Sequence, residues 1–431
     1  MAVLGLALAL AAVALPARGL VGPDAPPPAD RVEIVPVEGE AAKYWSRWRG
    51  PSGQGLVAGT NYPDRWSATE NVLWRTAVPG DGNSSPIVWG DRIFLTTSRD
   101  GGAKLSLLCF RRSDGERLWE TFAPTEGVEH AHEKNGHASA TPVTDGRRIW
   151  ASFGTHGLAA FDFDGKLVWH RDLGDLDNYH GSAGSPVLHD GRIYLYQDIR
   201  PTATLKSFVA AFDAETGETV WWQDREASVG WGTPVVIRAG DREELIVNSQ
   251  RQVWAYDPRS GEPLWWARGT TREVIPTPVA GHGLVFCSSG RAGPTLAIRP
   301  GGTGDVTDTH VVWSMPKGSP FVPSPLLVGD VLYLVNDMQS IVTAYRATTG
   351  EVLFQGRLGV AQREGFSASP VHVDGQVFFT NDQGETFVLA AGDEFTLLHV
   401  NTLGERTLAS PALVDGRWYF RTARELLAIG E

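Results

Sequence analysis

A pattern of two apolar runs separated by a tight polar turn recurs along the whole chain. Its clearest copies are PIVWGDRIFLTT, PVLHDGRIYLY, PLLVGDVLYLV, PVHVDGQVFFT and PALVDGRWYF. In these copies Gly-Asp or Asp-Gly stands at the centre, and such pairs readily adopt the positive φ angles of a two-residue turn. The residues on either side have the apolar-rich composition of strands. The pattern therefore predicts a β-hairpin in each copy.

Each predicted hairpin begins at a Ser-Pro or Thr-Pro pair. These pairs recur eight times, at intervals of 41 to 56 residues, with their prolines at Pro86, Pro142, Pro186, Pro234, Pro278, Pro325, Pro370 and Pro411. A fixed period of this length indicates a repeat architecture. Proline has no N–H, so it fits the first residue of an edge strand, such as the innermost strand of a propeller blade.

A second hairpin follows in most units and is clearest in AFDAETGETVW (211–221) and AYDPRSGEPLW (255–265). Two hairpins give four antiparallel strands. The chain is thus predicted to be all-β, an eight-bladed β-propeller of four-stranded antiparallel blades. The last unit starts at Pro411 and has room for three strands only, whereas ENVLWRTAV (70–78) reads like a fourth. We expect this N-terminal strand to complete the last blade and close the ring.

Large aromatic residues recur at one place in the units. The chain has sixteen Trp, and six of them stand at equivalent positions: Trp74, Trp119, Trp169, Trp221, Trp265 and Trp313. We expect each ring to be buried between neighbouring blades, with its N–H bonded to a local partner; an aromatic cage is the functional alternative. Cys109 and Cys287 fall in units one and five, so we expect two separate buried thiols.

The pattern A-x-D-x-x-T-G-x-x-x-W is intact at 211–221 and recurs with Ser in place of Thr at 255–265. It resembles the tryptophan-docking repeat of quinoprotein (PQQ) propellers, and the resemblance covers residues 45–431. Within that superfamily the chain is most similar to bacterial PQQ-like proteins related to the outer-membrane assembly factor BamB. The resemblance implies two alternatives: a non-catalytic binding or scaffold protein, or a PQQ- and calcium-dependent alcohol or sugar dehydrogenase. Fold alone does not choose between them.

The N-terminus differs in composition from the repeats. Residues 1–20 are mostly apolar, and a Pro/Ala-rich linker follows at 21–44. We interpret 1–20 as a signal peptide or N-terminal anchor, 21–44 as the linker and 45–431 as the propeller. The protein is expected outside the cytoplasm, in the periplasm, with membrane association through the N-terminal segment alone. Its net charge of −12 and lack of a basic run exclude a nucleic-acid partner.

Polar residues fall in the loops that should converge on one face of the propeller. The candidate ring for a protein partner or small ligand at the channel mouth is His137, His180, Trp231, Arg291, Asn336, Asn381, Arg406 and Arg421. The dehydrogenase resemblance implies arginines on the PQQ carboxylates and Trp231 on its ring face. It also implies calcium near Asn336 and Asn381, with Asp337 or Asp382 as the catalytic base. The other interpretation is that these residues cap strand ends and bind water.

The segment EHAHEKNGH contains His130, His132, Glu133 and His137. A metalloprotease HExxH motif needs two His four residues apart on a helix. Here His132 and His137 are five apart, and Asn135-Gly136 disfavours a helix, so no metal site is predicted. The longest interval between repeats contains this segment, and we expect an insertion that reaches over the channel mouth. Our primary prediction is a non-catalytic binding or scaffold protein without a cofactor.

Overall fold

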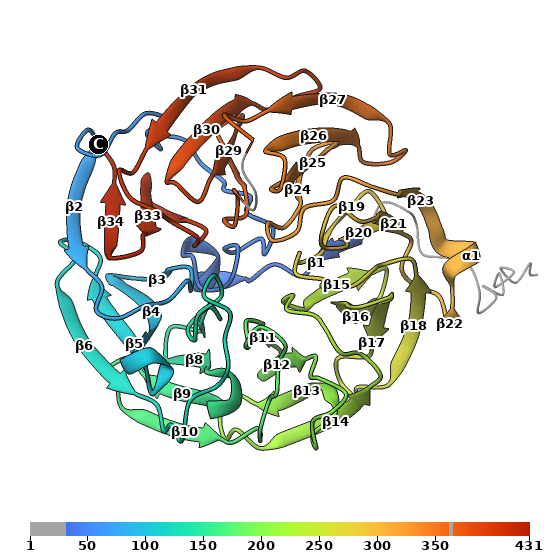
Figure 1. Cartoon of the computed structure of the whole chain (residues 1–431), viewed down its shortest axis with the longest axis horizontal. Helices are drawn as coiled ribbons and strands as arrows, with labels where there is room; N and C mark the ends of the chain where they lie inside the picture. The colour runs from blue at the N-terminus through green and yellow to red at the C-terminus, as the bar shows by residue number, and fades with distance from the viewer. Residues whose placement is uncertain (1–31, 362–364) are drawn as a thin grey trace, which may run out of the picture.

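Eight β-sheets stand around a central axis in the computed structural model, which describes residues 32–361 and 365–431 (Figure 1). In each sheet four antiparallel strands follow one another from the axis to the rim. The predicted all-β eight-bladed propeller is therefore confirmed. The predicted signal peptide or anchor at 1–20 lies outside the described residues.

The strands of the blades, from axis to rim, have the following bounds. Blade 1 is β3 (Ile87–Trp89), β4 (Arg92–Arg99), β5 (Lys104–Arg111) and β6 (Arg117–Phe122); blade 2 is β7 (Val143–Thr144), β8 (Arg148–Ser152), β9 (Leu158–Asp162) and β10 (Leu167–Arg171). Blade 3 is β11 (Val187–His189), β12 (Arg192–Gln197), β13 (Ser207–Asp213) and β14 (Thr219–Arg225); blade 4 is β15 (Val235–Ala239), β16 (Arg242–Asn248), β17 (Gln252–Tyr256) and β18 (Pro263–Arg268). Blade 5 is β19 (Val279–Gly281), β20 (Leu284–Ser288), β21 (Thr295–Ile298) and β23 (Val311–Met315); blade 6 is β24 (Leu326–Val328), β25 (Val331–Asn336), β26 (Ile341–Arg346) and β27 (Val352–Arg357). Blade 7 is β28 (Val371–Val373), β29 (Gln376–Thr380), β30 (Glu385–Ala390) and β31 (Leu397–Thr402); blade 8 is β32 (Ala412–Val414), β33 (Arg417–Arg421), β34 (Glu425–Ile429) and β2 (Val72–Ala77).

Blade 4 gains a strand at each edge. β1 (Val32–Ile34) pairs with its inner strand β15, and β22 (Gly304–Asp305) pairs in parallel with its outer strand β18. Residues of the predicted linker therefore take part in a blade. The helical elements of the described residues are short: η1 (Gly39–Lys43), η2 (Asp100–Gly102), η3 (Gly154–His156) and α1 (Thr307–His310).

The ring closes as predicted, because β2 is the outer strand of blade 8. It pairs antiparallel with β34, with Val72 opposite Ile429 and Ala77 opposite Glu425. The strand that precedes blade 1 in the sequence thus joins the last blade by hydrogen bonds. Closure thus gives the outer edge of β34 a hydrogen-bonded partner and completes the four strands of blade 8.

The repeated tryptophans pack against the next blade. The Trp221 indole N–H donates to the Pro258 carbonyl at 3.0 Å, and a Cβ on Gly261 would lie 2.5 Å from the Trp221 ring. The glycine of the repeated motif is therefore required by a close approach as well as by its φ of +77°. Trp74, Trp119, Trp169 and Trp313 also donate to carbonyls of the following blade. Trp265 instead donates to the Glu244 carboxylate of its own blade.

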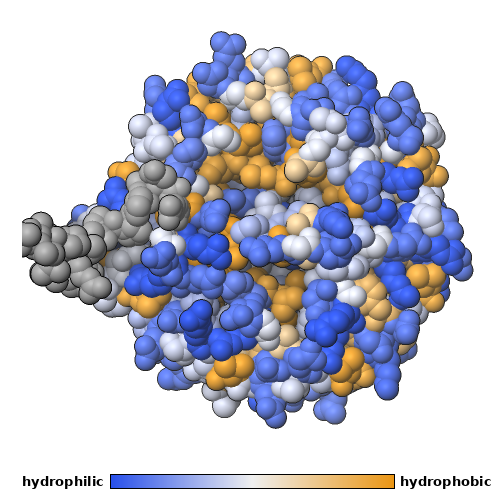
Figure 2. Space-filling model, turned by 180° about the vertical axis from the view of Figure 1, so that it is seen from behind, coloured by the Kyte–Doolittle hydropathy of each residue, from blue (hydrophilic) through white to orange (hydrophobic). Residues whose placement is uncertain are grey.

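An N-terminal segment that we call the plug, residues 45–57, crosses the middle of the ring (Figure 1). Seen from behind, a band of chain spans the centre, with hydrophobic side chains on either side (Figure 2). The plug uses hydrogen-bonding groups that the inner strands leave facing the axis. Its bonds join Trp45 O to Val88 N, Ser46 O to Thr144 N, Gln54 Oε1 to Ala280 N and Gly55 O to His372 N, at 2.8–2.9 Å.

The residues that precede the eight repeated prolines form a closed belt around the axis. The backbone N–H of each donates to the hydroxyl of the equivalent residue in the next blade, at 2.8–3.4 Å, and the last bond returns from Ser410 to Ser85. The belt consists of Ser85, Thr141, Ser185, Thr233, Thr277, Ser324, Ser369 and Ser410. These bonds connect all eight blades at the start of their inner strands.

Candidate functional site

A central cavity of about 220 Å³ lies on the axis, and all eight belt residues line it. The plug supplies its floor: Trp48 lines the cavity, and the indole N–H of Trp48 donates to the Thr277 hydroxyl at 3.2 Å. The inner strands run from the belt towards the plug, so the opposite end of the cavity faces the loops that join one blade to the next. We call that end the mouth.

A long connection between blades 1 and 2, residues 124–139, reaches over the mouth as predicted; we call it the mouth loop. Its Glu129 carboxylate accepts hydrogen bonds from the Thr155 N–H at 3.0 Å and from the Ser182 N–H and hydroxyl at 2.8 Å. Its Asn135 amide donates to the His180 carbonyl at 3.0 Å. The loop is therefore held by blade 2 and by the connection to blade 3.

Two acidic residues predicted as alternative catalytic bases lie at the mouth ends of blades 6 and 7. Asp382 forms an ion pair with Lys134 of the mouth loop at 3.0 Å. Asp337 is fully buried and accepts a hydrogen bond from the Phe321 N–H at 2.7 Å. Burial raises the pKa of Asp337 to about 6, and the charge of Asp382 adds to the rise, whereas Lys134 opposes it. The pKa of Asp382 is also raised by burial.

Three of the predicted ring residues line the cavity. His180 stacks on Trp231, with ring centroids 5.5 Å apart and an angle of 22° between the planes. The Arg291 guanidinium lies 4.7 Å from the centroid of the Phe321 ring and forms an ion pair with Glu273. The cavity wall thus combines aromatic surfaces with a cation.

Three other predicted ring residues lie outside the cavity lining. The Asn381 side chain binds its own turn: its amide donates to Glu385 at 2.8 Å, and its oxygen accepts from the Gln383 and Glu385 N–H groups. His137 packs over Gly102, where a Cβ would lie 2.7 Å from the imidazole. Asn336 is buried at the end of β25.

The last two predicted ring residues, Arg406 and Arg421, line a smaller separate cavity. Arg421 is buried, and its guanidinium donates to the Ser84 hydroxyl at 2.8 Å and to the Thr96 carbonyl at 2.7 Å. Burial lowers the pKa of Arg421 to about 9. These bonds join blade 8 to blade 1, so Arg421 contributes to the interface between the blades.

Sequence reasoning missed the residues that make up most of the cavity. The belt residues were already known from the sequence as the Ser or Thr of each Ser/Thr-Pro pair. Each of them stands at the start of an inner strand, and this constant position could have identified them as residues that line the axis. Trp48 and Lys134 carry no such periodic signal.

No group of three or more His, Cys, Asp or Glu in residues 32–361 and 365–431 is arranged to hold a metal ion. In the same part of the chain no helix is long and apolar enough to span a membrane.

Comparison with known proteins gives both family and fold. The chain matches the protein family described as outer membrane protein assembly factor BamB over residues 41–198 and 205–429. It is 22% identical over 378 residues to the tetrathionate hydrolase of Acidithiobacillus ferrooxidans, covering 81% of this chain and 65% of that protein. It is 29% identical over 157 residues to BamB of Alkalilimnicola ehrlichii, covering 36% of each. The chain thus spans less than two thirds of the length of these relatives. A europium-containing methanol dehydrogenase has a similar fold, with a TM-score of 0.68 and 10% identity over 90% of this chain and 98% of that one.

Proposed function

Because the chain belongs to the family described as outer membrane protein assembly factor BamB, we propose that it is a non-catalytic binding or scaffold protein that works outside the cytoplasm. The observation that carries this proposal is the construction of the channel. The plug closes one end, and the belt ties the eight blades to one another. The result is a rigid disc whose mouth face presents loops to a partner.

The alternative, a PQQ- and calcium-dependent dehydrogenase, does not fit the donor set of the cavity. Calcium takes six to eight oxygen ligands, commonly including carboxylates. No described residue that lines the cavity is an Asp or a Glu. Asp382 is paired with Lys134, and Cys109 and Cys287 are buried, unpaired and in different blades, so no adjacent-cysteine disulfide is available to flank a quinone. We derive no redox step for this chain.

Reconstitution tests the proposal against that alternative. The purified chain is incubated with PQQ and Ca²⁺, desalted, and assayed for retained quinone absorbance and for dye reduction with alcohols or sugars. We expect neither. Retained quinone together with turnover would contradict a non-catalytic protein.

Site-specific crosslinking tests the binding face. A photo-reactive residue is placed at Tyr179 on the mouth face or, as the matched control, at Glu215 in a hairpin turn on the opposite face; both side chains are exposed. In membranes of the source cell, we expect a discrete adduct with outer-membrane assembly proteins from position 179 and none from position 215. Adducts of equal yield from both faces, or none from either, would contradict the proposed face.

A further inference from the structure

Each hydroxyl of the belt has a proton left to donate. Its oxygen accepts the N–H of the preceding blade, and a Ser or Thr hydroxyl also carries one donor of its own. Within the described residues, none of the eight hydroxyls donates to a protein atom. Because all eight line the cavity, a ring of hydrogen-bond donors surrounds the channel axis.

Two cationic side chains lie in the wall of the cavity. Arg291 and Lys134 line it, and no carboxylate does among the residues described there. Both cations form ion pairs, Arg291 with Glu273 and Lys134 with Asp382. Among the described lining residues, a guest in this cavity therefore meets hydroxyl donors and the cationic members of two ion pairs, and no carboxylate.

His180 is a titratable group in the same wall. Burial lowers the pKa of its imidazole, and the charges of His132, Arg291 and His130 lower it further, whereas Glu273 opposes them. The imidazole also makes edge contacts with the rings of His132 and Tyr179, at 5.0 and 4.6 Å between centroids. An anion placed beside His180 would favour its protonated form.

We propose that the central cavity binds a small oxoanion, namely a sulfonate, carboxylate or phosphate group whose oxygens accept hydrogen bonds from the belt and pair with Arg291. Trp48 closes the floor, so the ligand enters from the mouth. Trp231 and Phe321 are part of the wall, packed against His180 and Arg291, and this aromatic lining favours an organic group attached to the anion. This site goes beyond the scaffold function and does not depend on a protein partner.

Calorimetric titration of the full chain with matched probes tests the proposal. Benzenesulfonate, benzoate and phenyl phosphate distinguish the three anions, inorganic sulfate tests the need for a ring, and benzenesulfonamide is the neutral control. We expect at least one aromatic anion to bind, more tightly at pH 5.5 than at pH 7.5 because binding favours protonated His180. Equal binding of benzenesulfonamide, or no binding of any anion to the folded chain, would overturn the proposal.

Variants at two lining positions locate the site, and thermal melts establish that each variant is folded. Arg291→Gln removes a cation from the wall, and we expect about tenfold weaker anion binding, the usual effect of losing one charge-assisted hydrogen bond. Ser324→Ala removes one belt donor and should weaken binding less, with Ser324→Thr restoring it. Arg346→Gln is the charge-matched control in a hairpin turn far from the cavity. If it weakened binding as much as Arg291→Gln, or if Arg291→Gln left binding unchanged, the proposed site would be wrong.

Discussion

The two ends of the central channel are built from different parts of the chain. At the plug end, Trp45 and its neighbours bond to strand edges, and Trp45 is 2% exposed within a hydrophobic cluster. At the mouth end, the channel is lined by hydroxyls, imidazoles and cations, and Tyr179 is 44% exposed. We infer that the plug end contributes stability to the disc, whereas the mouth end leaves polar groups available to a ligand.

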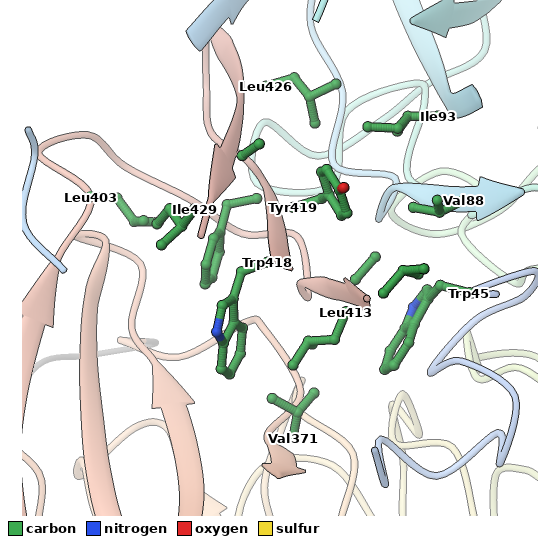
Figure 3. Close-up of a cluster of buried hydrophobic side chains, with 14 of the residues drawn as sticks. Trp45, Val88, Ile93, Val371, Leu403, Leu413, Trp418, Tyr419, Leu426 and Ile429 are labelled. Carbon is green, nitrogen blue, oxygen red and sulfur yellow. The ribbon is translucent and has the colours of Figure 1, made fainter. Parts of the chain in front are cut away.

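The largest effect is expected at the plug. Figure 3 shows Trp45 beside Leu413 and Val88, in the cluster that joins the plug to blades 8 and 1. Trp45→Ala removes a large buried ring, and we expect the free energy of unfolding to fall by about 3–5 kcal/mol. Denaturant titration measures it. Phe122→Ala, at an exposed rim position, is the control and should cost far less; equal losses would show that the plug is not part of the core.

A pH-dependent effect is expected at the mouth end. Folding raises the pKa of Asp337 to about 6, so the folded chain holds this proton more tightly than the unfolded chain. This proton's contribution to the free energy of unfolding is at most about 3 kcal/mol. It is complete below about pH 4 and is lost as the pH rises through 6. Asp337→Asn should therefore reduce the fall in unfolding free energy between pH 4 and 7.

Denaturant titrations across that pH range measure this change. Some dependence of the unfolding free energy on pH should remain in Asp337→Asn, because burial also raises the pKa values of Glu129 and Asp382. Glu215→Gln, in an exposed turn, is the control. An unchanged slope in Asp337→Asn would contradict the assignment of the effect to the mouth.

The belt lies between the two ends, and its loss should have an intermediate effect. Ser324→Ala leaves the Thr277 N–H without its acceptor, and we expect a loss of about 1–3 kcal/mol in unfolding free energy. Ser324→Thr keeps the hydroxyl, and Thr already occupies three belt positions. The unfolding free energy of this variant should therefore be close to that of the wild type. Similar losses in both variants would show that packing, rather than the hydrogen bond, matters at this position.

Most of the fold could be predicted because its determinants are local and repeated. The Ser/Thr-Pro pairs marked every inner strand, and Trp74 identified the strand that closes the ring, because it stands where Trp221 stands in its own unit. The plug could not be predicted in this way. Its sequence, WSRWRGPSGQGLV, does not alternate between apolar and polar residues as a strand does, and its hydrogen bonds join it to blades far apart in the chain.

The candidate site could be predicted only in part. The loops were correctly expected to converge on one face, and His180, Trp231 and Arg291 do line the cavity. The direction of a polar side chain depends on its immediate neighbours, which sequence spacing does not determine. Asn381 binds back to its own turn, and Arg421 donates to groups of the next blade.

The exposed aromatic ring of Tyr179, at the mouth end, should contribute less to stability than any residue discussed above. The Tyr179 ring contacts the Arg200 guanidinium at 5.0 Å and His180 at the mouth, but it keeps much of its surface in water. A cation–π contact at an exposed site is worth about 0.5–1 kcal/mol. We therefore expect Tyr179→Ala to lower the unfolding free energy by about 1 kcal/mol or less, measured beside Trp45→Ala. A loss as large as that of Trp45→Ala would mean that the mouth is as much a part of the stable core as the plug, and the division between the two ends would fail.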